Sequence, residues 1–308
     1  MLNLLTIYIW LLTCTPGDNL YEHYGHTALR VVDTEEQIDL CFNYGTFSFD
    51  TDNFYWKFVK GETWYMLSVE PTMFFLEDYV EEKRPVYMQE LNLTDIQKKR
   101  IAVALMENYR PENREYLYNF VEDNCSTRPF RLLKEVLGDS LKSTYKGHEG
   151  ETFRKFIRRY TREYTVIDGL INMIFGARAD RKMYGEDRLF LPEELMFYMQ
   201  EVTLADGTRL VGKSDIAPFV IKETRWWESC FLYIALFAVL MTLLSIYDRK
   251  RGRISWGVDA VLGVMYVLIL ALTIFLTFFS IHPLVGFNWR LLVIPAIHLC
   301  TRLIYILR

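Results

Sequence analysis

Two neighbouring runs near the start of the chain are rich in apolar and β-branched residues, and a polar segment separates them. Residues 24–32 form the first run, residues 33–37 the polar segment, and residues 38–44 the second run, which ends at Gly45. Two such runs joined by a short turn are typical of an antiparallel β-hairpin. We therefore predict two adjacent strands of a sheet in this part of the chain.

Apolar residues recur with helical spacing over residues 130–137, and the pattern stops at Gly138. Asp123 and Asn124 precede this run, and short polar residues in that position accept hydrogen bonds from the first N–H groups of a helix. A glycine directly after the run is a common helix end. The sequence therefore predicts a helix with Cys125 in its first turn.

The C-terminal part contains the longest apolar stretches of the chain. Three of them are long enough to cross a bilayer, at residues 229–247, 257–279 and 288–306. The loop at residues 248–253 is strongly basic, and basic loops stay on the cytoplasmic side of a membrane. We therefore predict an extracytoplasmic domain over residues 1–224 and a membrane domain with three helices over residues 225–308.

Composition and charge narrow the classes of partner. The chain has 308 residues, of which 51% are hydrophobic, and a formal net charge of −4. The acidic balance lacks the basic footprint of a nucleic-acid binder, so we expect no nucleic-acid partner. Aromatic residues are frequent between residues 42 and 90, where they either fill the core or line a groove for an acyl chain. The basic residues between 139 and 188 either form a solvated face or contact phospholipid head groups.

Cys125 is the strongest candidate for covalent chemistry. At a helix start, the positive end of the helix dipole and the free N–H groups favour a thiolate over a thiol. The same N–H groups stabilise an oxyanion. The competing interpretation is a small buried hydrophobic residue, which is the commoner role of a free cysteine. A catalytic cysteine requires a base.

His26 is the best-placed base among the five histidines, because it lies on the first strand of the predicted hairpin. Pairing Val32 with about Ile38 puts His26 opposite Asn43 or Tyr44. A polar side chain in that position orients an imidazole by accepting one of its ring N–H groups. We therefore predict His26 as the base and Asn43 or Tyr44 as the residue that orients it.

Four short segments, taken in order, resemble a known family. They read Leu-Thr-Cys-Thr-Pro-Gly at residues 12–17, Tyr-Gly-His-Thr-Ala-Leu-Arg at 24–30, Pro-Glu-Asn at 111–113 and Asp-Asn-Cys-Ser-Thr-Arg at 123–128. With the membrane segments behind them, they resemble the Lnb family of bacterial lipoprotein N-acyltransferases. The Asn124–Cys125 pair is also similar to the nucleophile motif of lecithin:retinol acyltransferase-like enzymes. The resemblance covers nearly the whole chain.

The resemblance implies an α+β fold in which a circularly permuted papain-like (NlpC-type) extracytoplasmic domain precedes the membrane helices. It implies that the apolar residues 1–12 form the first strand of that domain, after an export signal. It also implies a multi-pass protein of the bacterial inner membrane with its catalytic domain on the periplasmic side. The expected partners are a phospholipid acyl donor, a diacylglyceryl lipoprotein acceptor and the membrane, and no cofactor or metal is expected.

In this interpretation the chain moves a fatty acyl group from a phospholipid, through a thioester on Cys125, to the N-terminal amine of a lipoprotein. Supporting positions fall into two groups. We expect the first group to stabilise the oxyanion or support the nucleophile, and the second to bind substrate from the outer loop of the membrane domain. The first group is Asp123, Asn124 and Arg128, and the second is His282, Asn288 and Trp289.

Several alternatives fit the same residues. A cysteine–histidine pair also serves peptidases of the cell wall, phospholipases release the fatty acid to water, and a silent homologue would only bind. His23 and His26 lack the spacing of a zinc motif. Cys14 and Cys41 lie in an oxidising compartment in this interpretation, and a disulfide between them remains an alternative to two free thiols.

Overall fold

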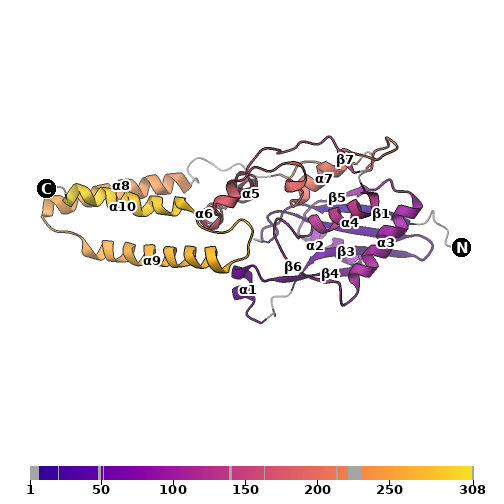
Figure 1. Ribbon diagram of the computed structural model, residues 1–308, viewed down its shortest axis with the longest axis horizontal. Coiled ribbons are helices and arrows are strands. Elements are labelled where there is room, and N and C mark those ends of the chain that lie inside the picture. Colours follow the sequence, from indigo (N-terminus) through magenta and orange to yellow (C-terminus); the bar gives the residue numbers. More distant parts are fainter. Residues whose placement is uncertain are drawn as a thin grey trace. The chain divides into compact units, whose positions relative to one another are not determined.

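The structure is a computed structural model, and it describes residues 7–19, 21–47, 50, 52–138, 141–162, 164–212, 214–220 and 230–306. The chain forms two compact units. The first unit combines Met1–Glu151 with Lys182–Val220, and the second combines Thr152–Arg181 with Ile221–Arg308. Figure 1 shows the elements of both units along the chain.

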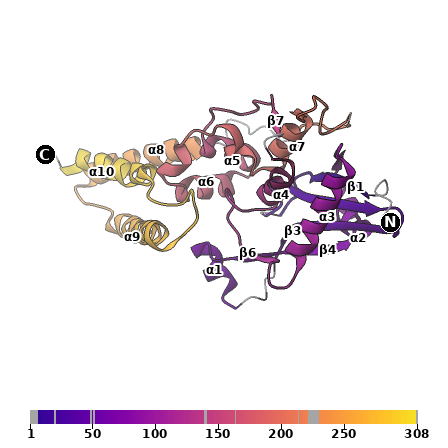
Figure 2. The ribbon, with the colours of Figure 1, turned by 45° about the vertical axis from the view of Figure 1, so that its right-hand side comes forward.

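A six-stranded antiparallel sheet is the centre of the first unit, as the ribbons in Figures 1 and 2 show. The strand order is β5-β1-β2-β3-β4-β6. Its strands are β1 (Ile7–Cys14), β2 (His26–Asp33), β3 (Ile38–Thr46), β4 (Trp64–Pro71), β5 (Val86–Glu90) and β6 (Glu115–Leu117). The central position of β1 and β2 explains their nearly continuous apolar sequence, because both of their faces are covered.

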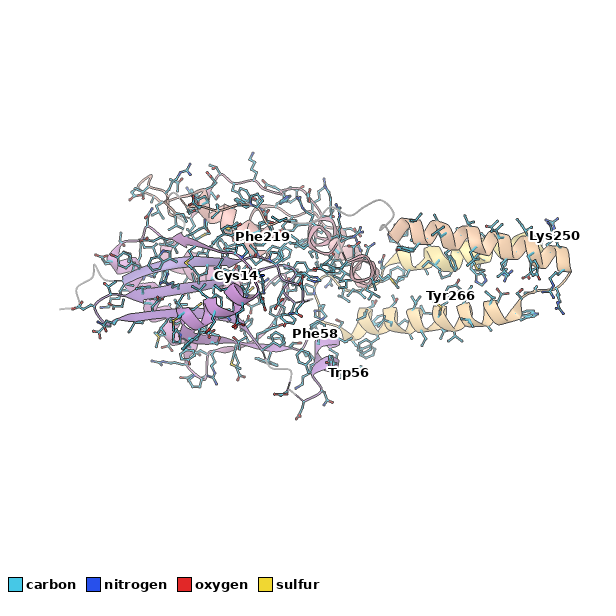
Figure 3. The ribbon with its side chains drawn as sticks, turned by 180° about the vertical axis from the view of Figure 1, so that it is seen from behind. Cys14, Trp56, Phe58, Phe219, Lys250 and Tyr266 are labelled. Atoms are coloured by element: carbon cyan, nitrogen blue, oxygen red, sulfur yellow. The ribbon has the colours of Figure 1, made fainter. Side chains whose placement is uncertain are left out.

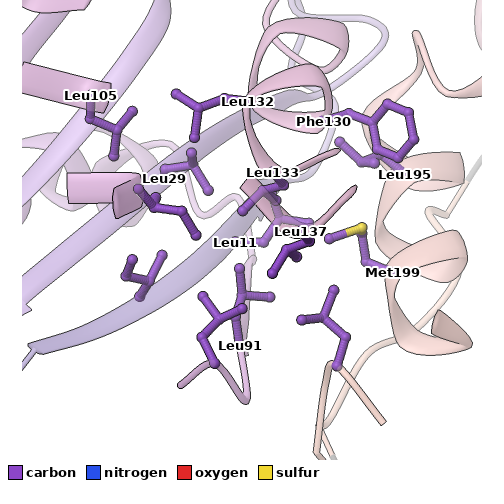
Figure 4. Packing of buried hydrophobic residues seen from close by; sticks show 14 of the residues in the cluster. Leu11, Leu29, Leu91, Leu105, Phe130, Leu132, Leu133, Leu137, Leu195 and Met199 are labelled. Atoms are coloured by element: carbon purple, nitrogen blue, oxygen red, sulfur yellow. The ribbon is translucent and has the colours of Figure 1, made fainter. Parts of the chain in front are cut away.

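Helices cover both faces of this sheet. Apolar side chains of α3 (Asp95–Tyr109), α4 (Thr127–Leu137) and α7 (Pro192–Gln200) pack with one face in the main core, which Figure 4 shows from close by. Side chains of the other face pack with Phe75 of α2 (Thr72–Glu81). Burial of these leucines and aromatics is the main driving force for folding, at about 25 cal/mol per Å² of apolar surface.

The remaining elements of the first unit are short. They are α1 (Phe54–Lys60), β7 (Lys142–Ser143), η4 (Gly185–Arg188) and β8 (Val202–Thr203). The strands β7 and β8 pair with each other in a separate two-stranded sheet. The unit is therefore a mixed α/β fold on an antiparallel sheet, and the permuted papain-like topology stays a prediction.

The predicted hairpin is present, but its register differs by one residue from the expected pairing. Ile38 pairs with Asp33 instead of Val32, and the ladder continues to Leu29 opposite Phe42. Gln37 adopts a positive φ of 55° and closes a turn with one residue fewer than the prediction assumed. Turn geometry sets hairpin register, and this detail of the turn is not visible in the apolar pattern.

The second unit contains two helices long and apolar enough to cross a membrane. They are α8 (Cys230–Arg251) and α9 (Trp256–Phe279). The third predicted span is wrong as a continuous helix: it divides into η6 (Trp289–Leu292) and α10 (Val293–Ile306). At 1.5 Å per residue, the 14 residues of α10 reach about 21 Å, short of the ~30 Å of a hydrocarbon core. Residue 229 and the predicted boundary between 224 and 225 lie outside the described residues.

A charged cluster joins α8, α9 and α10. Arg302 donates to Asp248 at 2.8 Å and to Asp259 at 2.7 and 2.9 Å, and all three side chains are mostly buried. His298 also lies 2.9 Å from the Asp259 carboxylate. An ionisable side chain in an apolar setting needs a partner of opposite charge, so these polar residues of α10 are tied to the two longer helices.

Three short elements also belong to the second unit: α5 (Phe153–Thr161), α6 (Thr165–Ile174) and η3 (Ala177–Asp180). The Gly176 N–H donates to the Leu284 carbonyl, and the Gly286 N–H donates to the Ile174 carbonyl. The buried Asn288 donates both amide hydrogens to carbonyls at the end of α6. The loop after α9 is therefore joined to α6 by backbone and side-chain hydrogen bonds.

Candidate active site

Asn124 organises the turn that carries Cys125. Its side-chain oxygen accepts the N–H groups of Ser126 and Thr127 at 2.9 Å, and its amide nitrogen donates to the carbonyls of Phe120 and Phe190 at 2.8 Å. The residue is buried, with 2% of its surface exposed. All of its hydrogen-bonding groups are engaged, so its amide has no hydrogen left for an oxyanion.

The helix α4 begins at Thr127, with Ser126 as its N-cap residue. Cys125 therefore lies just ahead of the helix, and the prediction that it occupies the first turn is wrong by two residues. The physical reason is the Asn124 side chain, which accepts the first two N–H groups and holds residues 124–126 as a turn. Cys125 remains at the positive end of α4, where the helix dipole favours an anion.

Cys125 and His26 are brought together, although 99 positions separate them in the chain. Burial raises the pKa of the Cys125 thiol, but the His26 charge and hydrogen bonds from His26, the Thr27 N–H and Ser126 lower it below its ordinary value. Burial lowers the pKa of His26, and the Cys125 thiolate then raises it above its usual value. The pair therefore favours a thiolate beside an imidazolium. Neither residue is fully buried.

Asn43 fixes the tautomer of His26. The His26 Nε2 atom lies 2.8 Å from the Asn43 Oδ1 atom, which also accepts the Gly45 N–H at 2.7 Å. An atom that accepts from a backbone N–H is an oxygen, so the orientation of the amide is settled. His26 must then donate through Nε2, which leaves Nδ1 as the basic atom of the neutral ring. Of the two predicted orienting residues, Asn43 therefore contacts the imidazole.

Tyr44 points to the opposite face of β3, as alternation along a strand requires. It is buried in the main core, and its carbonyl accepts the hydroxyl of Tyr116. Burial raises its pKa to about 12. Tyr44 therefore belongs to the packing behind the site, and the predicted orienting role falls to its neighbour.

Asp123 and Arg128 form an ion pair across the start of α4. The guanidinium donates to both carboxylate oxygens at 2.9 and 2.8 Å, and it stacks 3.6 Å from the ring centroid of Tyr116. Arg131 adds a second ion pair to Asp123 at 3.1 Å. A bidentate pair of this kind fixes geometry as well as charge. The Asp123–Arg128 pair therefore joins the turn around Cys125 to Tyr116 of β6.

Thr27 and Ser126 were not identified from the sequence, yet they join the two halves of the site. Their hydroxyl groups are 3.0 Å apart and fully buried, so they connect β2 to the start of α4. The Thr27 N–H and the Ser126 side chain also contribute to the lowered pKa of the Cys125 thiol. Thr27 follows His26 in the sequence and Ser126 follows Cys125. This adjacency is the sequence signal that could have identified them.

Gly45 is a third residue that sequence reasoning did not single out. A Cβ atom at this position would lie 2.4 Å from His26 Cε1 and 3.1 Å from Asn43 Oδ1. Real carbon atoms do not approach so closely. The absence of a side chain at Gly45 therefore leaves the room that the imidazole occupies.

The predicted substrate-binding residues of the outer loop belong to the second unit. Asn288 is 2% exposed and its amide hydrogens hold α6, as described above. Trp289 is largely exposed and His282 is partly exposed. A role of these three residues in substrate binding stays a prediction.

Cys14 and Cys41 are free thiols. They lie on β1 and β3 with β2 between them, so their Cα atoms are separated by at least about 9.5 Å of sheet. A disulfide requires Cα atoms within ~7 Å, which excludes the bridge considered above. Burial raises the pKa of Cys14 to about 12, which keeps this thiol protonated.

Two other features bear on the chemistry. Among the described residues, no group of three or more histidine, cysteine or acidic residues is placed to hold a metal ion. A hollow of about 690 Å³ lies beside α3, and Ile7 of β1 contributes to its lining. Ile7 is at the opposite end of β1 from Cys14, the residue that pairs with His26. The hollow is therefore separate from the thiol site.

Comparison with known families agrees with this arrangement of a soluble and a membrane part. The family model described as the Lnb N-terminal periplasmic domain matches residues 2–162. The model described as the Lnb transmembrane domain matches residues 222–308. No curated protein and no solved structure matches the chain.

Proposed function

Because this chain belongs to the Lnb family, we propose that it is a phospholipid:lipoprotein N-acyltransferase of the bacterial inner membrane. Family membership indicates a membrane protein with a periplasmic portion and a role in lipoprotein processing. The observation that carries the finer proposal is the Cys125–His26–Asn43 arrangement, in which a thiol of lowered pKa stands beside an oriented base. Such an arrangement forms covalent acyl intermediates.

In the first half-reaction the Cys125 thiolate attacks an ester carbonyl of a phospholipid. A C–S bond forms, the ester C–O bond breaks, and His26 gives the proton on Nδ1 to the departing glycerol oxygen. The products are an acyl thioester on Cys125 and a lysophospholipid. His26 is then neutral, with Asn43 still holding its Nε2–H.

In the second half-reaction the N-terminal amine of a diacylglyceryl lipoprotein attacks the thioester carbonyl. The amine loses its proton to His26 Nδ1, an amide C–N bond forms, and the C–S bond breaks to restore the thiolate–imidazolium pair. An amide is far less reactive toward nucleophiles than the thioester it replaces. The transfer therefore proceeds without a further energy source.

The backbone N–H of Cys125 is the best candidate to stabilise the oxyanion of both steps. The N–H groups of Ser126, Thr127 and Arg128 all donate to Asn124. Within the described part of the chain, the Cys125 N–H donates to no acceptor. A backbone donor at the start of a helix, on the nucleophilic residue itself, is suited to a charge that develops only in the transition state. We assign positioning roles to Asn124, Asp123 and Arg128.

Product analysis tests this proposal. The full chain in proteoliposomes receives a phospholipid with isotope-labelled acyl chains and a synthetic diacylated lipopeptide. Tandem mass spectrometry should find the label in an amide on the lipopeptide N-terminus, with lysophospholipid in equal amount. Cys125→Ser should abolish transfer, and His26→Ala should reduce it at least about 10²-fold. Labelled free fatty acid without an acylated lipopeptide would replace the proposal by a phospholipase.

A further inference from the structure

The helix α1 presents aromatic side chains to its surroundings. Tyr55, Trp56 and Phe58 are 79%, 57% and 47% exposed, and Figure 3 shows the side chains of Trp56 and Phe58. The helix has seven residues, and Phe54 is its buried residue. So much aromatic surface on one short element exceeds the scattered exposed hydrophobics of an ordinary protein surface and indicates an interaction site.

The aromatic residues of α1 continue inward as a series of stacked rings. Phe58 stacks on Phe54 at 6.1 Å between centroids, Phe54 on Phe47 at 6.0 Å, and Phe47 on Tyr65 at 4.8 Å. Tyr65 then stacks on Tyr118 at 4.1 Å. The interplanar angles of these four contacts are 24°, 15°, 21° and 22°. We call these five residues the aromatic stack.

The inner end of the aromatic stack lies beside the turn that carries the candidate nucleophile. Tyr118 is followed by Asn119, whose backbone pairs with that of Asp123, two residues before Cys125. Burial raises the pKa of Tyr65 and of Tyr118, and the charge of the Cys125 thiolate raises each of them further. The stack therefore runs from the surface at α1 toward the turn of Cys125, and it lies entirely within the first unit.

We propose that α1 inserts into the outer leaflet of the membrane and that the aromatic stack receives the acyl chain of the donor phospholipid. The inference rests on the proposed function, since it assigns the route by which that donor reaches Cys125. Stacked rings cover one another's faces, and the edges of a continuous row of rings form an apolar wall that suits a hydrocarbon chain. The ester group at the head of the chain then reaches the thiolate when the chain lies along the stack.

The chemistry of α1 favours a bilayer over a protein partner. Tryptophan and tyrosine are the side chains enriched at membrane interfaces, and Trp56 and Tyr55 project from this helix. Lys57 lies in its last turn, where a cation complements the phosphate groups of lipids, and Lys60 in the same turn pairs with Glu62 at 2.7 Å. The same chain carries α8 and α9, which are long and apolar enough to cross a membrane. A protein with such helices is bound to a bilayer.

A comparison of two acyl donors tests the proposal. The full chain in proteoliposomes is given either labelled phospholipid in the bilayer or a water-soluble short-chain thioester, and acylation of Cys125 is followed by intact mass. For Tyr55→Ser with Trp56→Ser, the rate from bilayer phospholipid should fall roughly tenfold or more, because apolar area that binds the interface is lost. The rate from the soluble donor should stay at the wild-type value.

A matched control comes from α3, where Val103 and Met106 are 60% and 53% exposed. Val103→Ser with Met106→Ser removes exposed apolar surface outside the aromatic stack, and both rates should stay at wild type. Insertion of Trp56 is measured directly with phospholipids brominated on the acyl chain, which quench the fluorescence of nearby tryptophans. These lipids should quench the tryptophan fluorescence of wild type more than that of Trp56→Phe, because Trp56 lies in the leaflet.

The possible results separate this inference from the function it rests on. If wild type acylates Cys125 from both donors but the α1 double variant matches it with bilayer phospholipid, the route is wrong and the transferase stands. Equal loss with both donors would also overturn the route, because α1 would then support the site itself. A wild-type protein that forms no acyl-Cys125 from either donor overturns the route and the proposed function together.

Discussion

Replacing Gly45 with alanine adds one methyl group at the edge of the site and removes no functional group. The new carbon would lie 2.4 Å from His26 Cε1 and 3.2 Å from His26 Nδ1. Unstrained carbon atoms lie about 3.5–4.0 Å apart, so the imidazole must move by about 1 Å. The φ angle of Gly45 is not among the positive ones, so alanine fits its backbone.

The size of the effect follows from that displacement. A misplacement of about 1 Å in a reacting group costs about 10²-fold in rate, which corresponds to roughly 2.7 kcal/mol of transition-state stabilisation. The Asn43 oxygen lies 3.1 Å from the same methyl group, so the hydrogen bond that holds the imidazole is disturbed as well. We therefore expect Gly45→Ala to acylate Cys125 about 10²-fold more slowly than wild type.

The assay is the rate of acyl-Cys125 formation under single-turnover conditions, followed by intact mass, together with thermal unfolding of the same preparations. Gly212→Ala is the matched control, because its new methyl group meets only Asn92, at 3.8 Å. It should keep the wild-type rate. Wild-type acylation by a folded Gly45→Ala variant would refute the role of His26 geometry.

Three further predictions address the thiol, the turn and the membrane cluster. Iodoacetamide should alkylate Cys125 at pH values lower than those needed for an ordinary thiol, because the pKa of Cys125 is lowered. In His26→Ala the lowering effect of the imidazole is lost while burial still raises the pKa of Cys125, so alkylation at pH 7 should be slower. Asn124→Ala should lower the free energy of unfolding, measured in urea, by roughly 3–5 kcal/mol, because two N–H groups and two carbonyls lose a buried partner. Asn124→Asp keeps the oxygen that accepts the two N–H groups, so its free energy of unfolding should fall by less. Arg302→Ala should lower the free energy of unfolding by roughly 3–5 kcal/mol, because the carboxylates of Asp248 and Asp259 lose their counter-charge, and the melting temperature in detergent should fall. Arg251 is exposed, so Arg251→Ala should lower the free energy of unfolding by less than about 0.5 kcal/mol.

Each of these has a contrary outcome. Equal alkylation rates for wild type and His26→Ala across the pH range would show that the imidazole does not lower the thiol pKa. An Asn124→Ala protein as stable as wild type would show that the turn does not depend on that amide. Equal melting temperatures for the Arg302 and Arg251 variants would remove the ion cluster as a tie between the helices.

Features set by neighbouring residues could be predicted from the sequence. The helix after Asp123 and Asn124, and its end at Gly138, follow from capping and periodicity, which are local. The position of Cys125 at the helix start follows from the same pattern to within two residues. The family assignment rested on four short motifs in order, and the family models confirm it.

Features set by tertiary contacts could not be predicted in the same way. Asn124 was expected to stabilise the oxyanion or to support the nucleophile, and the sequence does not show that Phe190, 66 positions later, accepts one of its two amide hydrogens. The one-residue register error in the hairpin came from the backbone of Gln37. The third membrane span was expected from apolar composition, which is insensitive to the break between η6 and α10.

The aromatic residues between 42 and 90 show a similar limit. Their number suggested either core or groove, and composition cannot separate the two. The structure buries Phe75 in the core, exposes Trp56, and stacks Phe47 on Tyr65. Whether an aromatic ring is buried or exposed depends on the strand face or loop that it occupies. This placement in the fold decides which rings can contact a lipid.

The most direct test of the central claim is to isolate the acyl-enzyme and discharge it. The full chain is incubated with phospholipid, freed of donor, and its intact mass is measured before and after addition of a diacylated lipopeptide. We predict a gain of one acyl mass on wild type, mapped to Cys125, which disappears as the lipopeptide gains the same mass; Cys125→Ser should show neither change. A wild-type protein without the adduct, beside a lipopeptide that is nevertheless acylated, would contradict a thioester on Cys125.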